Sequence, residues 1–311
     1  MTDHDELELP ESRWVDVGGP VHYRQWDGPG DGPVFVCVHG LGGSLVNFAL
    51  VAPALAEHGR TIALDLVGFG KTPPEGRGTH VGANRHVLDG FLKALHLPPV
   101  VLVGNSMGGM ISVIQCAHAP ETVEAMILVD AALPRTRRIE GQFPPRVAAL
   151  FALYSVFRGV GTRMLDRRME RLGAERIVEE TLRLCTVDPG RIDPRLVRSL
   201  VANTTHRQGL DYASRAFMDA AGSIFNAQAR PGRYREIVTR AHGPALVIHG
   251  KQDRLVPIGS AREAVTWHDD WELVELDDAG HIPQMEVPDR WIAVVQGWLS
   301  RTSLGDRAAA V

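Results

Sequence analysis

Residues 100–109 read V-V-L-V-G-N-S-M-G-G, an apolar run followed directly by a G-x-S-x-G pattern centred on Ser106. The run predicts a buried strand, and a helical pattern follows over residues 107–119. Ser106 therefore falls on a turn between a strand and a helix. Such a turn strains the backbone of the serine and needs small neighbours, because the chains approach closely there. The helix N-terminus also points backbone N–H groups at any negative charge that forms near the hydroxyl.

Short apolar runs on both sides of this turn alternate with helical patterns. The runs that predict strands buried on both faces are 34–38, 61–64, 100–103 and 125–129. Residues 245–248 and 272–276 also predict strands. The patterns that predict helices between them are 47–58, 81–95, 107–119, 260–266 and 288–299. This alternation is typical of βαβ units and a mostly parallel central sheet flanked by helices. Two further runs, 14–17 and 21–26, predict an N-terminal hairpin of half-exposed strands.

The alternation is interrupted once, over residues 133–240. This segment has no clear strand pattern, and its stretches 163–172 and 174–184 are amphipathic and rich in Arg. We therefore predict an α/β core formed by 13–132 and 241–300, an inserted helical cap over 133–240, and flexible termini at 1–12 and 301–311. A segment inserted there lies above the carboxyl ends of the strands, where ligands bind in open α/β sheets. The apolar residues Phe151, Tyr154 and Phe157 indicate either an apolar substrate part or ordinary helix packing.

The composition is that of an ordinary globular protein. The 311 residues are 44% hydrophobic and 23% charged, and Lys plus Arg at 33 against Asp plus Glu at 37 gives a net charge of −4. Because no basic excess is available to neutralise phosphates, we expect no nucleic-acid partner. Cys37, Cys116 and Cys185 have neither zinc nor disulfide spacing, which fits a reducing compartment. With no signal-peptide pattern and no apolar stretch of about 20 residues, we expect a cytoplasmic protein without integral membrane association.

Two glycine-rich segments resemble phosphate-binding loops without completing either pattern. In residues 40–45, Leu45 stands where the dinucleotide motif has its third glycine. In residues 65–72, Asp65 stands where a phosphate loop ending in G-K-T has its first glycine. The sequence therefore predicts no nucleotide cofactor.

A serine hydroxyl is a poor nucleophile by itself, so the chain must supply a base and an acid. His281 lies in D-A-G-H-I-P, a loop between the last predicted strand and the last helix. Asp253 lies in the loop that follows the predicted strand 245–248, from which a carboxylate can orient that histidine. Asp130, directly after the strand 125–129, is a competing acid. We favour Asp253.

The loop after the strand 34–38 reads H-G-L-G-G-S. It can offer one backbone N–H to an oxyanion, and the residue after the nucleophile can offer another. The candidate donors are the N–H groups of Leu41 and Met107. His39 itself is expected to be a structural residue of the loop.

Together these segments resemble the α/β-hydrolase superfamily over about residues 21–299. The resemblance is carried by the HG at His39, the elbow at Ser106, the acid loop at Asp253 and the GH at His281, together with D-L-V-G-F-G at 65–70. It implies the α/β-hydrolase fold and the chain order nucleophile, acid, histidine that Ser106, Asp253 and His281 follow.

The resemblance also narrows the chemistry. Dehalogenases and epoxide hydrolases of this fold use an aspartate at the elbow, where this chain has Ser106. Hydrolases of meta-cleavage products, which cut carbon–carbon bonds, often carry a G-N-S-M-G-G elbow like residues 104–109. They usually also have a tryptophan after the catalytic histidine and a G-P-G-like oxyanion loop, where this chain has Ile282 and the G-G-S of residues 42–44.

We therefore expect a serine hydrolase that cleaves a small-molecule carboxylic ester, with an apolar part, through an acyl-enzyme. A serine triad needs no cofactor or metal, and none is predicted. The alternatives are a carbon–carbon bond hydrolase, a cofactor-free perhydrolase, or a ligand-binding protein of the same fold. The oligomeric state, including a homo-oligomer, is left open by the sequence.

Overall fold

The structure is a computed structural model that describes residues 7–135, 158–302 and 304. Within these residues, eight strands form one sheet in the order β1-β2-β4-β3-β5-β6-β7-β8. The strands are β1 (Arg13–Asp16), β2 (Pro20–Trp26), β3 (Phe35–Val38), β4 (Thr61–Leu64), β5 (Val100–Asn105), β6 (Val123–Val129), β7 (Ala245–Gly250) and β8 (Trp271–Leu276). Strands β3 to β8 are parallel, whereas the hairpin β1–β2 joins β4 in the antiparallel direction. The predicted hairpin and the predicted, mostly parallel sheet are confirmed.

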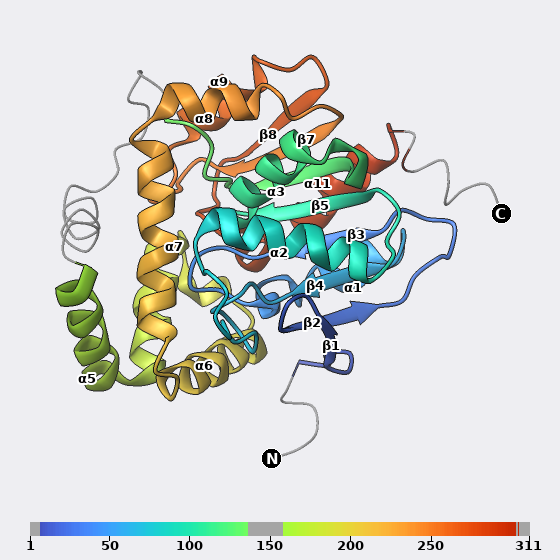
Figure 1. The fold of residues 1–311 in the computed structure, drawn as a ribbon. Helices are drawn as coiled ribbons and strands as arrows, with labels where there is room; N and C mark the ends of the chain where they lie inside the picture. The colour runs from blue at the N-terminus through green and yellow to red at the C-terminus, as the bar shows by residue number, and fades with distance from the viewer. Residues whose placement is uncertain (1–6, 136–157, 303, 305–311) are drawn as a thin grey trace.

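Helices cover both faces of the sheet (Figure 1). They are α1 (Ala52–Ala56), α2 (Val81–Ala94), α3 (Met107–His118), α9 (Ile258–Val265), α10 (Pro283–Glu286) and α11 (Pro288–Leu299), with the short 3₁₀ helices η1 (Leu45–Phe48) and η2 (Pro120–Thr122). The predicted continuous helix over 47–58 is wrong, since η1 and α1 divide it. Pro53 lies in the first turn of α1, where its missing N–H is tolerated, but it cannot continue a helical ladder from the preceding residues.

The segment between β6 and β7 is described over residues 130–135, which are irregular, and over 158–244, which are mostly helical. It contains α5 (Arg158–Cys185), η3 (Pro189–Arg191), α6 (Pro194–Gln208), α7 (Ala213–Gln228) and α8 (Pro231–Val238). We call it the helical insertion. Gly173, at φ 71°, breaks α5 between the two predicted amphipathic stretches. The limits of a separate cap unit stay a prediction, and Phe151, Tyr154 and Phe157 lie outside the described residues.

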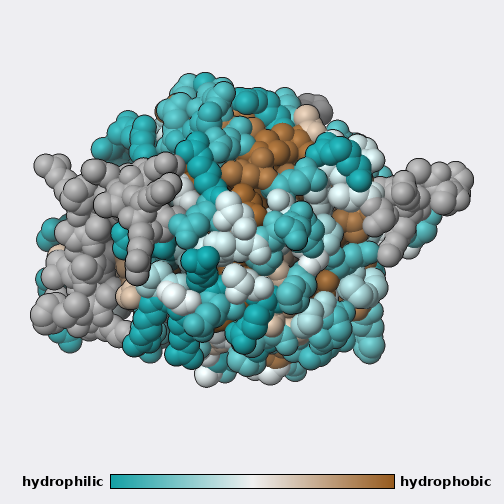
Figure 2. Space-filling model, turned by 90° about the horizontal axis from the view of Figure 1, so that it is seen from above, coloured by the Kyte–Doolittle hydropathy of each residue, from teal (hydrophilic) through white to brown (hydrophobic). Residues whose placement is uncertain are grey.

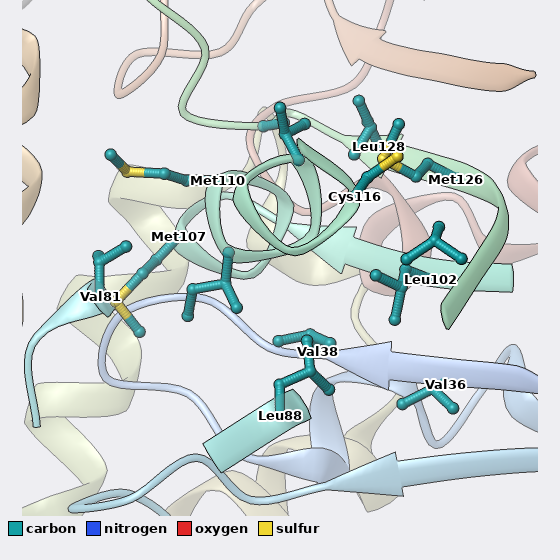
Figure 3. Packing of buried hydrophobic residues seen from close by; sticks show 14 of the residues in the cluster. Val36, Val38, Val81, Leu88, Leu102, Met107, Met110, Cys116, Met126 and Leu128 are labelled. Atoms are coloured by element: carbon teal, nitrogen blue, oxygen red, sulfur yellow. The ribbon is translucent and has the colours of Figure 1, made fainter. Parts of the chain in front are cut away.

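The core has a layer of apolar side chains on each side of the sheet. On one side, Met107, Met110 and Cys116 of α3 gather with strand residues such as Leu102 and Leu128 (Figure 3). Alternate residues of the same strands, such as Val101 and Val103, pack in the other layer with α1 and α11. Because both faces are covered, the central strands are apolar throughout, as the runs in the sequence predicted.

The outer surface is mostly hydrophilic in the view from above, with an apolar patch between polar side chains (Figure 2). Among the described residues, Trp14 and Met164 are the large apolar side chains that are exposed. None of the described helices is long and apolar enough to cross a bilayer. The predicted cytoplasmic location stays a prediction.

Candidate active site

Ser106 lies at the turn between β5 and α3, with φ 55° and ψ −114°, a left-handed conformation that a residue with a side chain adopts only under strain. The glycines around it are required by close contacts. A Cβ at Gly108 would lie 1.9 Å from the carbonyl oxygen of Val38, and one at Gly104 would lie 2.6 Å from the backbone of Gly109. The turn therefore holds a partly exposed serine at the carboxyl edge of the sheet, as expected of an elbow.

The loop after β3 lies against this elbow. A Cβ at Gly40 would be 3.2 Å from Cβ of Ser106. The backbone N–H of the next residue, Leu41, therefore lies near the Ser106 side chain. Among the described residues, no atom accepts a hydrogen bond from the Leu41 N–H. The Met107 N–H belongs to the first turn of α3, where backbone donors have no partner within the helix. Both predicted donors therefore belong to the segments that meet at Ser106, and neither has an acceptor within the part of the chain that the structure describes.

His39 is a structural residue of the same loop. One ring nitrogen lies 2.8 Å from the carbonyl oxygen of Gly40, and the other accepts a hydrogen bond of 3.0 Å from the Leu66 N–H. The ring is fully buried, and this burial lowers the pKa of His39. A neutral ring with both nitrogens bonded to backbone groups holds the loop and has no free nitrogen for a substrate.

His281 and Asp253 form a tight pair. Nδ1 of His281 lies 2.7 Å from Oδ2 of Asp253, and the other carboxylate oxygen accepts the Leu255 N–H at 2.7 Å and the Val256 N–H at 3.1 Å. Burial alone would raise the pKa of Asp253, but the rings of His281 and His249 and the backbone donor outweigh burial and lower this pKa. An ionised Asp253 therefore orients the His281 ring through Nδ1. The other ring nitrogen, Nε2, is not used in this contact.

The loop that carries His281 is bonded to the elbow. The Asn105 side chain, directly before Ser106, donates hydrogen bonds of 3.1 Å to the carbonyl oxygens of Val129 and His281. Among the described residues, the Ser106 hydroxyl has no hydrogen bond to the His281 ring, so Asn105 provides the bond between the elbow and the His281 loop. A hydrogen bond between nucleophile and base often closes only when substrate binds.

Asp130 lies directly behind this pair, at the end of β6 and with φ 43°. One of its oxygens accepts the Gly250 N–H at 2.9 Å, and the other is buried and has no hydrogen-bond partner. Burial, and then the charge of Asp253, raises the pKa of Asp130 well above its usual value. The competing acid is thus placed beside Asp253, but His281 bonds to Asp253.

His249, fully buried at the end of β7, was not singled out from the sequence. Its Nε2 lies 3.0 Å from the carbonyl oxygen of Val256 and 3.6 Å from an oxygen of each aspartate. Burial lowers the pKa of His249, so a neutral ring fills the space between Asp130 and Asp253. A buried histidine at a strand end next to the acid loop is the signal that could have identified it.

Asp130, Asp253 and His281 also bring possible metal ligands together, since one ligand atom of each lies within 4.8 Å of the others. The existing contacts do not suit a cation. The bond of 2.7 Å between Asp253 and His281 is too short to have an ion between its atoms, and Asp130 already binds a backbone N–H. The donor set fits proton transfer better than metal binding.

A groove of about 540 Å³ lies elsewhere, between α5 and α6 of the insertion. It is lined by side chains of these two helices and by Pro189, and no candidate catalytic residue contributes to it. Nearer Ser106, a Cβ at Gly42 would lie 3.2 Å from the ring of Phe217 on α7. Helix α7 therefore packs against the loop that carries Leu41, one of the two candidate oxyanion donors.

A family model described as the alpha/beta hydrolase fold matches residues 33–288, more than half of the chain. The protein therefore belongs to the α/β-hydrolase family, and it is a hydrolase by this membership. The predicted fold class and family resemblance are confirmed.

Particular relatives include hydrolases of dienoic acids. The chain is 29% identical over 304 residues to 2-hydroxy-6-oxo-6-(2'-aminophenyl)hexa-2,4-dienoic acid hydrolase of Metapseudomonas resinovorans, covering 96% of this chain and 94% of that protein. The structure of 2-hydroxy-6-oxo-6-phenylhexa-2,4-dienoate hydrolase from a Rhodococcus species matches with TM-score 0.71 and 25% identity, covering 94% and 98% of the two chains. A thermophilic esterase of Thermogutta terrifontis shares the fold, with TM-score 0.69, 21% identity, and coverage of 94% and 98%.

Proposed function

We propose that the protein is a serine hydrolase that cleaves carboxylic esters with Ser106, His281 and Asp253. The observation that carries the proposal is the 2.7 Å contact between His281 and Asp253, on a loop hydrogen-bonded to the strained turn of Ser106. Asp253 fixes the tautomer in which Nδ1 of His281 carries the proton, so Nε2 is free to act as the base.

The reaction has two halves. Oγ of Ser106 attacks the ester carbonyl carbon while Nε2 of His281 takes the hydroxyl proton, and that proton then passes to the leaving alcohol oxygen as the ester bond breaks. In the second half, His281 takes a proton from water, the resulting hydroxide attacks the acyl-enzyme, and the proton returns to Oγ of Ser106. The N–H groups of Leu41 and Met107 stabilise the oxyanion in both halves, and each such donor typically contributes about 3–4 kcal/mol to lowering the barrier.

The helical insertion is proposed as the cap of this site. Phe217 on α7 lies against Gly42, and this contact places an apolar ring beside the loop of the proposed donor Leu41. An ester with an apolar part, acting as a small-molecule substrate, fits this surrounding. No resident cofactor is required by the proposed steps.

Carbon–carbon bond hydrolysis is the second candidate, favoured by the relatives named for 2-hydroxy-6-oxo dienoic acids. We favour ester cleavage over carbon–carbon cleavage because Ile282 follows His281 where carbon–carbon hydrolases usually have tryptophan. The G-G-S of residues 42–44 likewise replaces their G-P-G-like loop.

The test compares wild type and Ser106→Ala on p-nitrophenyl esters of rising acyl length and on 2-hydroxy-6-oxo-6-phenylhexa-2,4-dienoate. We expect wild-type ester turnover, its loss by at least about 10³-fold in Ser106→Ala, and little turnover of the dienoate. A preference for the dienoate would transfer the proposal to carbon–carbon hydrolysis. Equal ester turnover in both proteins would contradict a role for Ser106.

A further inference from the structure

Glu286 is a buried acid that joins the loop of His281 to the helical insertion. It is the last residue of α10, and it is 2% exposed. One carboxylate oxygen accepts the N–H of Val187 at 2.7 Å and of Asp188 at 3.0 Å, and the other accepts the N–H of Gly280 at 2.8 Å. A single side chain thus bonds on one side to the residue before His281 and on the other to the turn that follows α5.

The backbone of His281 lies against the same part of the insertion. The His281 N–H donates to the carbonyl oxygen of Cys185 at 2.6 Å, and a Cβ at Gly280 would lie 2.4 Å from that oxygen. The acid loop is bonded there too, because the Arg254 side chain donates to the carbonyl oxygen of Arg183 at 3.0 Å. The end of α5 is therefore in contact with both loops that carry the proposed base and acid.

We propose that Glu286 is a positioning residue that sets the place of His281 through the insertion, so that the insertion and the catalytic base move as one unit. This inference rests on the proposed role of His281. The new inference adds a role for Glu286, whose side chain bonds to backbone N–H groups and not to the His281 ring.

The physical reason is the number of donors that converge on this carboxylate. Three backbone N–H groups require an acceptor, and a carboxylate is a group of this size that accepts at both oxygens. A glutamine has the same shape but presents an NH₂ group at one end. In either orientation its NH₂ faces a backbone N–H. The repulsion between these two donors pushes Gly280 and the turn after α5 apart. Displacing a base by about 1 Å can reduce a rate by about 100-fold.

The test is Glu286→Gln, with Arg191→Ala as the matched control. Arg191 also joins the insertion to this loop, through a bond of 2.9 Å to the carbonyl oxygen of Asp278, but on the exposed surface. We expect Glu286→Gln to lower kcat for the best p-nitrophenyl ester about 10- to 100-fold with KM within about twofold. Its rate of labelling at Ser106 by a fluorophosphonate should fall in parallel, while Arg191→Ala stays within about twofold of wild type in both measurements.

Rates are expressed per folded protein, from the unfolding curve of each variant. Wild-type kcat per folded Glu286→Gln molecule would overturn the proposal, as would a loss confined to KM. If Glu286→Gln does not fold, Glu286→Asp decides, because its carboxylate is one methylene too short to reach both partners. A lower kcat at unchanged KM supports the inference, and wild-type kcat overturns it. Failure of the proposed function is distinguishable, since Ser106→Ala would then keep its activity or the fluorophosphonate would not label Ser106 in wild type.

Discussion

Asp253 and Asp130 differ in the protonation state that their surroundings stabilise, although both lie behind His281. Asp253 accepts two backbone N–H groups and the His281 ring, whereas Asp130 accepts a single backbone N–H and has an unpartnered buried oxygen. Two buried carboxylates this close cannot both ionise easily, so the proton stays with the acid that has fewer donors. The surroundings therefore favour the protonated form at Asp130 and the ionised form at Asp253.

This difference predicts the effects of two matched amide substitutions on ester turnover. Asp253→Asn should lower kcat/KM by about 10³- to 10⁴-fold, because an amide no longer fixes the tautomer of His281. Asp130→Asn should keep kcat/KM within about fivefold, since an amide has the shape of the protonated acid that this site favours. Steady-state kinetics on one p-nitrophenyl ester measures both, and equal losses would contradict the assignment of Asp253.

At the scale of the elements, the strand-to-helix turn depends on how closely α3 approaches β3. Gly108 and Gly82 occupy the same position, second in α3 and in α2 respectively. A Cβ at Gly108 would lie 1.9 Å from a backbone oxygen of Val38, whereas one at Gly82 would meet only the His80 ring at 3.4 Å. The same substitution therefore has opposite consequences in the two helices.

We predict that Gly108→Ala lowers the free energy of unfolding by about 3 kcal/mol or more, because backbone must move to accept the methyl group. Gly82→Ala should raise it by about 0.5–1 kcal/mol through helix propensity. Urea unfolding of both variants measures the difference. A similar effect at both positions would show that the close approach of α3 to Val38 does not require glycine at position 108.

At the scale of the whole molecule, Asp65 connects segments from three parts of the core. Its carboxylate, 2% exposed, lies 2.8 Å from Nδ1 of His22 on β2 and accepts the Leu45 N–H at 2.8 Å and the Lys71 N–H at 2.9 Å. Burial would raise the pKa of Asp65, but the hydrogen bond with His22, the nearby rings of His22 and His39 and the Leu45 donor lower it. The acid thus stabilises the hairpin, the start of η1 and the turn after β4 together.

A lowered pKa in the folded state means that this stabilisation is present above the unfolded pKa of about 3.9 and is lost as the pH falls through the folded value. Asp65→Asn should therefore lower the free energy of unfolding by about 3 kcal/mol at pH 7, and by less near pH 3, because Asp65 of the unfolded chain is then mostly protonated and part of the stabilisation is lost. Urea unfolding at pH 7 and near pH 3 provides the comparison. A difference that does not change with pH would contradict the role of the charge.

Much of the sheet and its helices could be predicted from the chain because the signals are local. The run at 61–64 coincides with β4, and the predicted helix at 288–299 coincides with α11. Other boundaries differ by one or two residues, where a strand such as β5 continues through the polar Asn105 to the elbow. The helix predicted over 47–58 failed because a helical spacing of apolar residues does not reveal how Pro53 divides the segment.

The sequence by itself determined the strand–helix alternation, the glycines of the elbow, and the loops that hold Ser106 and His281, since each depends on residue types a few positions apart. Only the tertiary structure decided which aspartate His281 contacts, because two acids at the same sheet edge are equivalent until donors surround one of them. The tertiary structure also revealed the contacts of Glu286, whose partners Val187 and Asp188 lie 99 and 98 positions away in the chain. Contacts at such separation arise from packing the insertion against the core, and no local pattern encodes them.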